Sequence, residues 1–327
     1  MHTRDTRDEF GRARVRSIAI VGAGLFCLEV LTGSAARAQA PEQSSGTSPP
    51  AAIGLGSRGW SASETIRATP PKDRETSPLE FSAKFGAASD YIYRGTTLSD
   101  RKPAAGGAIE VTWAWLYAGV TAATVKLPTQ PAAEITAGGG VRPKIGNIDL
   151  DFGVTYFHYP GEAVSGPTNG IDYWEAVGRA DTRIGELIRV AGGFAYSPNV
   201  SNTGAWSQYT ALGIGVEVPS RLLPDKVSVS FTSAAGYSWF GRQAAVLGGF
   251  ELPAYLNWQA GVTFTRGNFN VDLRYYDTNL SPENCFVFTG DPNAQPGGRV
   301  DPITNPDGLV SRWCSATFVA KVWFALN

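Results

Sequence analysis

The sequence has 327 residues and a formal net charge of −1, with 17% charged residues, 11% aromatic residues and 38 glycines. The charged fraction is below the roughly 25% that is usual in soluble domains, and abundant small and aromatic residues are typical of β-strands. No basic stripe is present that would neutralise phosphates, so the composition argues against nucleic acid as a partner.

The N-terminal 38 residues have the order of a secretory signal peptide. Arg12, Arg14 and Arg16 precede an apolar run over 18–31, and small residues follow up to Ala38. A charged start, an apolar centre and a small-residue cleavage site define such signals. The run of about 14 residues is shorter than the roughly 20 that a membrane-spanning helix needs. We therefore expect export through the inner membrane and cleavage after Ala38.

Residues 39–78 are rich in Pro, Ser, Gly and Thr and show no sustained periodicity. Such a composition is typical of a flexible segment that buries too little apolar surface to fold. The chain is accordingly divided into a signal peptide over 1–38, a flexible periplasmic leader over 39–78 and a β-barrel over 79–327.

A regular alternation begins at Leu79. Apolar Leu79, Phe81 and Phe85 alternate with polar Glu80 and Lys84. Because successive side chains of a strand point to opposite faces, this segment has one apolar and one polar face. Its length exceeds the about five or six residues of ordinary strands and suits a tilted transmembrane strand, which needs roughly nine to eleven.

The same pattern recurs to the C-terminus. The tight break at Arg266-Gly267-Asn268 between two alternating segments is typical of a hairpin. Twelve strands are predicted, at 79–94, 104–114, 116–127, 132–143, 147–159, 170–184, 187–198, 205–218, 226–240, 253–266, 268–278 and 311–326. The sixth is the least regular, because Glu175 and Arg179 share a face with Tyr173 and Val177.

The connections alternate between long and short. Outer-membrane barrels have short periplasmic turns and longer external loops, and an even strand count leaves both ends of the barrel in the periplasm. We expect an all-β fold, a transmembrane antiparallel β-barrel of about twelve strands in an up-and-down meander. Its location would be the cell outer membrane.

A secreted β-sandwich is the main alternative, because its strands also alternate. Strand length argues against it, and so do aromatic rings near the predicted strand ends, where amphipathic rings favour the membrane interface. The rings in question are Tyr91, Tyr93, Trp113, Tyr117, Tyr156, Tyr159, Tyr196, Trp239, Tyr275, Trp323 and Phe324.

One block of sequence resembles a known family. The run from Ala88 to Asp100 contains Asp90-Tyr91-Ile92-Tyr93-Arg94-Gly95 and is followed by Pro103-Ala104 and by Tyr117-Ala118-Gly119. This order resembles the opening of the TorF-family porins of Gram-negative bacteria. The resemblance implies an outer-membrane barrel of the porin type over about 79 to the C-terminus. It implies no particular substrate, since that family is poorly characterised.

Polar residues opposite the apolar face are expected to line the lumen. These candidates are Lys84, Asp90, Arg94, Glu110, Glu134, Arg142, Asp149, Asp151, Arg189, Glu217, Asp272 and Arg274. Two interpretations stay open. The charges can give a water-filled pore a local field that biases which solutes pass, or they can be paired charges that fill and brace a narrow barrel.

Arg94 lies near the predicted outer rim. It can contribute to a constriction together with Asp90, four residues earlier on the same face. Alternatively, it pairs with Asp90 or Asp100 and simply fixes the first external loop.

An enzymatic role is considered because a lipid-facing histidine can act as a base. His158 is the only histidine after the signal peptide and lies at the end of the fifth predicted strand. A base also needs a nucleophile and an orienting group, and the nearby Ser165 lies in a loop without a recognisable motif. We therefore predict no catalytic residue, and keep a hydrolase as an alternative.

Two cysteines, Cys285 and Cys314, remain after removal of the signal peptide, and an even count in an oxidising compartment favours a disulfide. It would close the base of the longest loop, over 279–310. That loop is then either a lid over the mouth, a surface for partners or a braced exposed loop. No metal site and no cofactor are predicted, because histidine and free thiol ligands are too few.

The leading hypothesis is a porin-like channel, not an enzyme, for passive diffusion of small hydrophilic solutes or ions. Its other partners would be outer-membrane lipid, the barrel assembly machinery and periplasmic chaperones. The alternatives are a lipid-facing hydrolase that uses His158, or a plugged structural or adhesive barrel that acts through its external loops.

Overall fold

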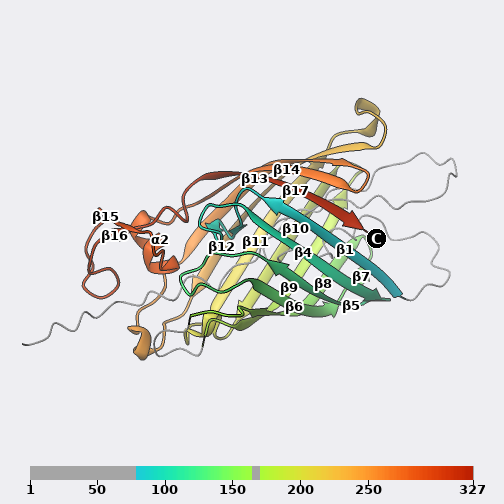
Figure 1. Ribbon diagram of the computed structural model, residues 1–327. Coiled ribbons are helices and arrows are strands. Elements are labelled where there is room, and N and C mark those ends of the chain that lie inside the picture. Colours follow the sequence, from blue (N-terminus) through green and yellow to red (C-terminus); the bar gives the residue numbers. More distant parts are fainter. Residues whose placement is uncertain (1–78, 164–169, 327) are drawn as a thin grey trace, which may run out of the picture.

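The computed structural model describes residues 79–163 and 170–326, and the signal peptide and leader expected for 1–78 lie outside these residues. Twelve long strands form an antiparallel barrel (Figure 1). They are β1 (Leu79–Ala88), β4 (Ala104–Trp113), β5 (Leu116–Ala123), β6 (Glu134–Val141), β8 (Ile148–His158), β9 (Tyr173–Ile184), β10 (Ile188–Ser197), β11 (Ser207–Glu217), β12 (Val227–Phe240), β13 (Tyr255–Arg266), β14 (Phe269–Thr278) and β17 (Thr317–Leu326).

Shorter elements lie in the connections. They are the strands β2 (Ile92–Tyr93), β3 (Thr96–Thr97), β7 (Lys144–Ile145), β15 (Gln295–Pro296) and β16 (Leu309–Val310), the helix α2 (Pro282–Thr289) and the 3-10 turns η1 (Val200–Asn202), η2 (Ser220–Leu222) and η3 (Ala245–Leu247). Within the described residues, no helix is both long enough and apolar enough to cross a bilayer.

The barrel closes between the first and last strands. β1 pairs with β4 on one side and with β17 on the other, where Phe85 lies opposite Phe324. The two rings stack with their centroids 5.7 Å apart. All other long strands pair with the neighbouring long strands in the chain. The predicted all-β, up-and-down barrel of twelve strands is therefore confirmed.

The two faces of the wall differ as the alternation requires. On β1, Phe81 is 62% exposed and Phe85 is 54% exposed, whereas the neighbouring Lys84 is 3% exposed. Exposed large apolar side chains lie on every barrel strand except β6, for example Ile109, Leu212 and Phe318. A closed barrel with an apolar outer face satisfies its backbone internally and matches a lipid surround.

The two ends of the barrel are unlike. Short connections, such as 114–115, 185–187 and 267–268, lie at the end where β1 begins, here called the turn end. Long connections, including 89–103, 159–172 and 279–316, lie at the opposite loop end, on the side of α2 in Figure 1. The 218–226 connection is the long exception at the turn end and extends beyond its neighbours.

Several strand boundaries were predicted wrongly, and the first and twelfth strands show the largest differences. The first strand was expected to reach 94 but ends at Ala88, because Arg94 and Gly95 adopt left-handed φ angles of 44° and 83° and turn the chain back on itself. The twelfth was expected from 311 but begins at Thr317. Residues 311–314 instead belong to the long loop that the disulfide closes. The alternation did not predict the helix α2 of this loop.

Some aromatic rings expected at the membrane interface lie inside the barrel instead. Trp113, Tyr156, Trp239 and Phe324 are exposed on the outer face as expected. Tyr91, Tyr93, Tyr117, Tyr159 and Trp323 are buried, so that part of the prediction was wrong. Parity decides the difference, since these rings lie on the inward-facing positions of a strand or on a loop that folds inward.

Candidate functional site: the lumen and its constriction

The charged side chains near the turn end form ion pairs with one another. The Arg142 guanidinium donates to both oxygens of Glu110, with Nη1–Oε1 and Nη2–Oε2 distances of 2.7 and 3.0 Å. Its Nε donates to Asp151 at 3.3 Å, and it stacks on the Tyr117 ring, 3.6 Å from the centroid. One arginine thus has two carboxylate partners, all attached to the barrel wall.

Two further pairs have the same character. Arg189 on β10 donates from Nε to Asp181 on β9 at 3.0 Å. Arg274 on β14 contacts Asp272 on the same strand through Nε and Nη2, at 3.0 and 2.8 Å. Buried charges are tolerated where such partners exist. Burying a charged group without a partner costs on the order of several kcal/mol per ion.

Nine of the twelve sequence-predicted lumen residues are buried in the structure, and the other three are partly buried. Lys84, Asp90, Arg94, Glu110, Glu134, Asp151, Arg189, Asp272 and Arg274 are buried, whereas Arg142, Asp149 and Glu217 are partly buried. Charged residues that the sequence analysis did not include share this inner wall. They are Glu175, Arg179, Asp181, Arg183 and Lys321. The parity of Glu175 and Arg179 with Tyr173 was the available signal, and it marks the inner face.

A hairpin from the first long loop folds into the lumen. β2 and β3 pair with each other, and their tight turn is formed by Arg94 and Gly95. A Cβ atom at Gly95 would lie 2.3 Å from Thr278 Cγ2 and 3.0 Å from Asn257 Cβ, so the turn touches the wall at β13 and β14. The hairpin therefore extends from its attachment between β1 and β4 to the wall at β13 and β14.

Arg94 joins the hairpin to β9. Its Nη1 and Nη2 donate to Oε1 and Oε2 of Glu175 at 3.2 and 3.0 Å, and both side chains are 1% exposed. The guanidinium carbon lies 4.4 Å from the centroid of Tyr93 and 4.3 Å from that of Tyr209. The expected pairing of Arg94 with Asp90 or Asp100 was therefore wrong, because the turn carries its side chain across the lumen.

Two carboxylates anchor the hairpin's base. Asp90 Oδ1 accepts from the hydroxyls of Thr97 and Ser99, at 2.5 and 2.9 Å, which fixes the chain reversal. Burial raises the pKa of the Asp90 carboxyl, and these hydrogen bonds act in the opposite direction. Glu134 on β6 accepts from the hydroxyls of Tyr91 and Tyr159.

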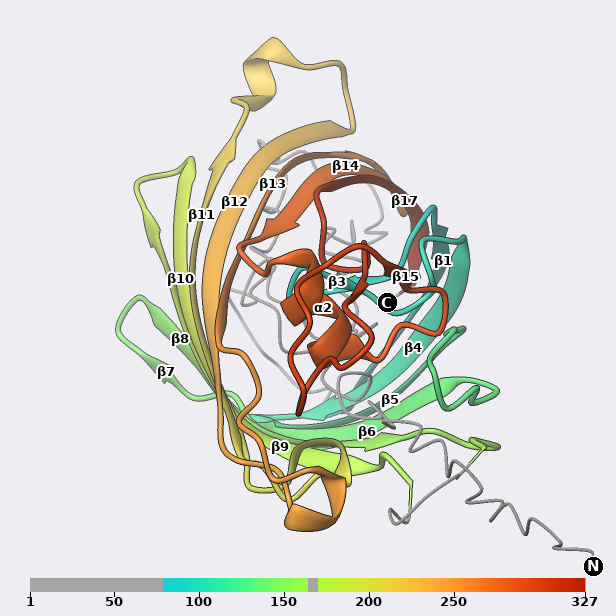
Figure 2. The same cartoon turned by 90° about the vertical axis from the view of Figure 1, so that its left-hand side faces the viewer.

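The long loop 279–316 covers the hairpin from outside, and Figure 2 shows α2 across the mouth of the barrel. Ser281 caps the helix by accepting from the Asn284 amide, and Phe288 packs on Phe240 and Tyr255. The expected disulfide joins Cys285 to Cys314. We call residues 279–316 the cap.

The cap and the hairpin are joined directly. The Thr97 amide donates to the Trp313 carbonyl at 3.0 Å, and the Arg101 guanidinium donates to the Ser315 carbonyl at 2.9 Å. Tyr91, Ile92, Leu98 and Phe288 are all at most 1% exposed. Hairpin and cap therefore pack against each other at the loop end.

Large inner side chains lie along the wall where a neighbouring strand carries glycine. A Cβ atom at Gly236 would lie 2.1 Å from Tyr209 Oη, and one at Gly140 would lie 2.8 Å from Tyr117 Oη. Tyr117 crosses Gly140 to donate to Asp151 on the strand beyond, at 2.9 Å. Glycine therefore lets these rings lie flat on the wall instead of pointing toward the barrel axis.

His158 lies on the outer face, as the alternation predicts. Its Nδ1 is 2.6 Å from Asp172 Oδ2, and the same oxygen accepts from the Tyr156 hydroxyl at 3.1 Å. Asp172 is thus an orienting group that the sequence did not reveal. No serine, threonine or cysteine hydrogen-bonds to His158 among residues 79–163 and 170–326, and Ser165 lies outside the described residues.

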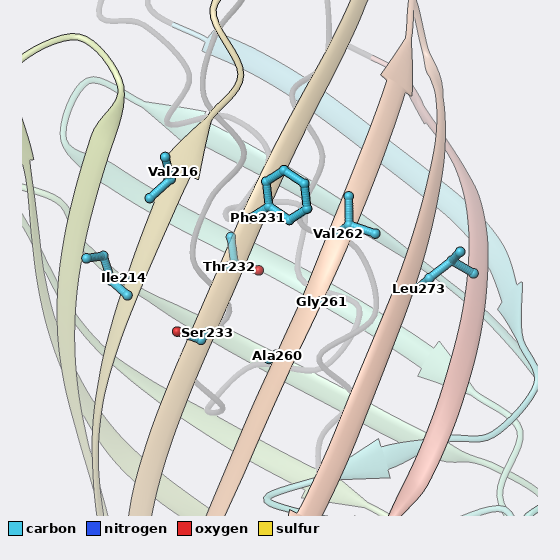
Figure 3. A pocket seen from close by; sticks show the side chains of 9 residues that line it. All are labelled: Ile214, Val216, Phe231, Thr232, Ser233, Ala260, Gly261, Val262 and Leu273. Atoms are coloured by element: carbon cyan, nitrogen blue, oxygen red, sulfur yellow. The ribbon is translucent and has the colours of Figure 1, made fainter.

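The outer wall carries a shallow pocket on β11 to β14, shown in Figure 3. The floor of the pocket lies at Ser233 and Ala260. The apolar side chains around it are those of Ile214, Val216, Phe231, Val262 and Leu273. Its lining is apolar and faces away from the lumen, as lipid contact requires. In the part of the chain that the structure describes, no three or more His, Cys, Asp or Glu side chains are grouped to hold a metal ion.

Residues 72–295 match a protein family described as "Bacterial protein of unknown function (Gcw_chp)". The chain belongs to this family. A comparison with curated proteins found no match. The Gcw_chp match includes the hairpin and eleven of the twelve barrel strands, up to β14, but not β17.

A comparison with solved structures found matches that include the following three. The NanC porin is 7% identical and covers 76% of this chain and 100% of its own, with a TM-score of 0.39. OmpT, an outer membrane protein of Vibrio cholerae, is 10% identical, covers 76% and 99%, and has a TM-score of 0.32. OccK3 of Pseudomonas aeruginosa is 12% identical, covers 78% and 67%, and has a TM-score of 0.33.

Proposed function

We propose that this protein is a porin-like channel of the outer membrane through which small hydrophilic solutes or ions diffuse. The observation that carries the proposal is the charged inner wall of the closed barrel. Arg142, Arg189 and Arg274 each pair with wall carboxylates, while the outer face is apolar. Water in a lumen hydrates such charges and so removes most of the desolvation free energy of keeping them inside the barrel. A dry core, in contrast, is more stable with apolar residues than with ion pairs.

The flat packing of the inner rings supports the same proposal. Tyr117 and Tyr209 lie over glycines of neighbouring strands, so they narrow the lumen less than rings that project toward the axis. Twelve strands fall between the eight that side chains fill and the sixteen or more of wide porins. We therefore propose a narrow channel whose constriction is the β2–β3 hairpin. The twelve predicted lumen residues would line its path, and the TorF-like block 88–100 would be the segment that builds the constriction.

Planar-bilayer recording of the refolded full-length protein tests the proposal. The wild type is compared with a variant in which residues 92–97 are replaced by a short Gly-Ser turn. We expect small conductance steps for the wild type and larger steps for the variant, because the hairpin occupies the lumen. Absence of steps from both proteins, although they are folded, would contradict a channel and favour the plugged barrel that acts through its external loops.

A lipid-facing hydrolase is the second candidate, and the His158–Asp172 contact of 2.6 Å favours it. A carboxylate that orients a histidine is part of known hydrolytic sites, but a nucleophile within hydrogen-bond distance is also required. Replacing His158 with Ala while following lipid-ester hydrolysis tests this candidate. Unchanged lipid products would rule it out.

A further inference from the structure

The constriction combines acidic groups on the wall with a cation on the hairpin. Glu175 on β9 and Glu134 on β6 face the lumen and are 0% and 1% exposed. Glu134 accepts from the hydroxyls of Tyr91 and Tyr159, while Glu175 accepts from Arg94. The cation that pairs with Glu175 therefore belongs to an inserted loop and not to the wall.

The contacts of Arg94 have the geometry of a cation-binding site. The guanidinium makes two parallel hydrogen bonds to one carboxylate, and its central carbon lies between the rings of Tyr93 and Tyr209 at 4.4 and 4.3 Å. Proteins recognise guanidinium and alkylammonium ligands by this combination of bidentate carboxylate and aromatic faces. Tyr209, like Glu175, is part of the wall and stays in place without the hairpin.

Other arginines of the lumen differ in this respect. Arg142 and Arg189 are attached to the wall or to its turns, and each pairs with a carboxylate on a nearby strand. The backbone that carries each of them is held in the wall or in its short turns. Arg94 lies on a two-residue turn, so its carboxylate can be vacated by movement of the hairpin alone.

We propose that Glu175, Glu134 and Tyr209 form a binding site for small organic cations, of the guanidinium and alkylammonium classes, which Arg94 fills in this structure as a tethered ligand. The inference rests on the proposed channel function, because solutes would reach the site through the lumen. It names the class of solute that the constriction favours. Passage of such a cation would require it to replace Arg94 at Glu175.

Chemical rescue of an Arg94 variant tests the site. Full-length Arg94→Gln protein in detergent is titrated with guanidinium chloride at millimolar concentration, with sodium chloride as the ionic-strength control. We expect saturable binding by calorimetry and a raised melting temperature, and binding to the wild type weaker by about tenfold or more because Arg94 competes. No saturable binding to folded Arg94→Gln would overturn the proposal.

Two matched variants separate the site from general charge effects. Arg94→Gln combined with Glu175→Gln removes the carboxylate and should abolish binding. Arg189→Gln also vacates a buried carboxylate, that of Asp181, but no ring stacks on Arg189 within the described residues, so it should bind guanidinium more weakly by about tenfold. Equal binding to all three variants would overturn the proposal. Should Arg94→Gln misfold, Arg94→Lys keeps a charge on the hairpin, and guanidinium should still displace the less well-matched ammonium saturably.

The same proteins in planar bilayers distinguish this inference from the channel proposal. Binding of guanidinium without any conductance would leave the site standing and contradict the channel. Conductance without guanidinium binding, and with equal permeability to sodium and guanidinium in reversal-potential measurements, would contradict the site and leave the channel standing.

Discussion

The two ends of the barrel use buried charge in different ways. Near the turn end, Arg142 holds Glu110 and Asp151 within the wall, so each arginine has its partners whatever the loops do. At the loop end, Arg94 reaches Glu175 from an inserted hairpin. The same type of ion pair therefore stabilises the wall at the turn end and attaches the inserted hairpin to the wall at the loop end.

Removing one carboxylate from each end should give the largest contrast. Glu175→Gln leaves Arg94 buried without an anionic partner, and we expect a loss of about 3–5 kcal/mol in the free energy of unfolding. Glu110→Gln leaves Arg142 with Asp151, and the loss should be about 1–2 kcal/mol. Urea titrations of the two variants in lipid vesicles measure the difference. Equal losses would mean that the two ends are not distinct.

Removing the disulfide should lower the stability of the loop end only. Cys285→Ala with Cys314→Ala removes the bond across a sequence separation of 29 residues, for which the chain-entropy model gives about 3–4 kcal/mol of lost stability, often less in practice. The cap should become sensitive to limited proteolysis while the strands stay protected. Mass spectrometry of the fragments locates the cuts, and cleavage at the turn end instead would argue against a local effect.

A methyl group in the wall tests the flat packing of Tyr209. Gly236→Ala places a Cβ atom 2.1 Å from Tyr209 Oη, so the ring must move toward the axis. We expect a stability loss of about 1–3 kcal/mol and a smaller conductance. Gly192→Ala is the control, because its Cβ meets nothing nearer than Leu212 Cδ2 at 3.2 Å on the outer face. A larger effect for the control would refute the role of Gly236.

The smallest expected effect concerns the cap's helix. Ser281→Ala removes the side chain that accepts from the Asn284 amide and should cost about 1 kcal/mol. Hydrogen exchange of the α2 amides should increase, with unchanged exchange in β14. Faster exchange in both elements would show that helix and wall unfold together.

The barrel was predictable because alternation is a local property of the chain. Each strand of the wall follows from which residues share a parity. Glu175 and Arg179 were nevertheless interpreted as an irregularity of the sixth strand and not included among the lumen candidates, although their shared parity with Tyr173 marks the inner face. The hairpin was not predictable in this way. Residues 88–94 continue the alternation, and only the left-handed turn at Arg94-Gly95, stabilised by contacts with distant strands, directs them into the lumen.

The candidate site was predictable in part for the same reason. Twelve inward residues could be named from parity, yet the partner of Arg94 could not, because Glu175 is 81 residues away in the chain. Asp172, which contacts His158, lies beyond a loop and was missed likewise. The parity of a residue in a strand predicts the face of the wall on which its side chain lies. Which residue it pairs with depends on the path that the loops take between the strands.

The Cys285–Cys314 bond also bears on how the barrel is assembled. β14 and β17 are neighbours in the sheet although the cap separates them in the chain. A covalent link formed in the periplasm before insertion would hold these two strands close together, and shortening the effective loop between them lowers the entropy of bringing them into register. The last strand would then reach the membrane already paired on one side, with only its contact to β1 left to complete the ring.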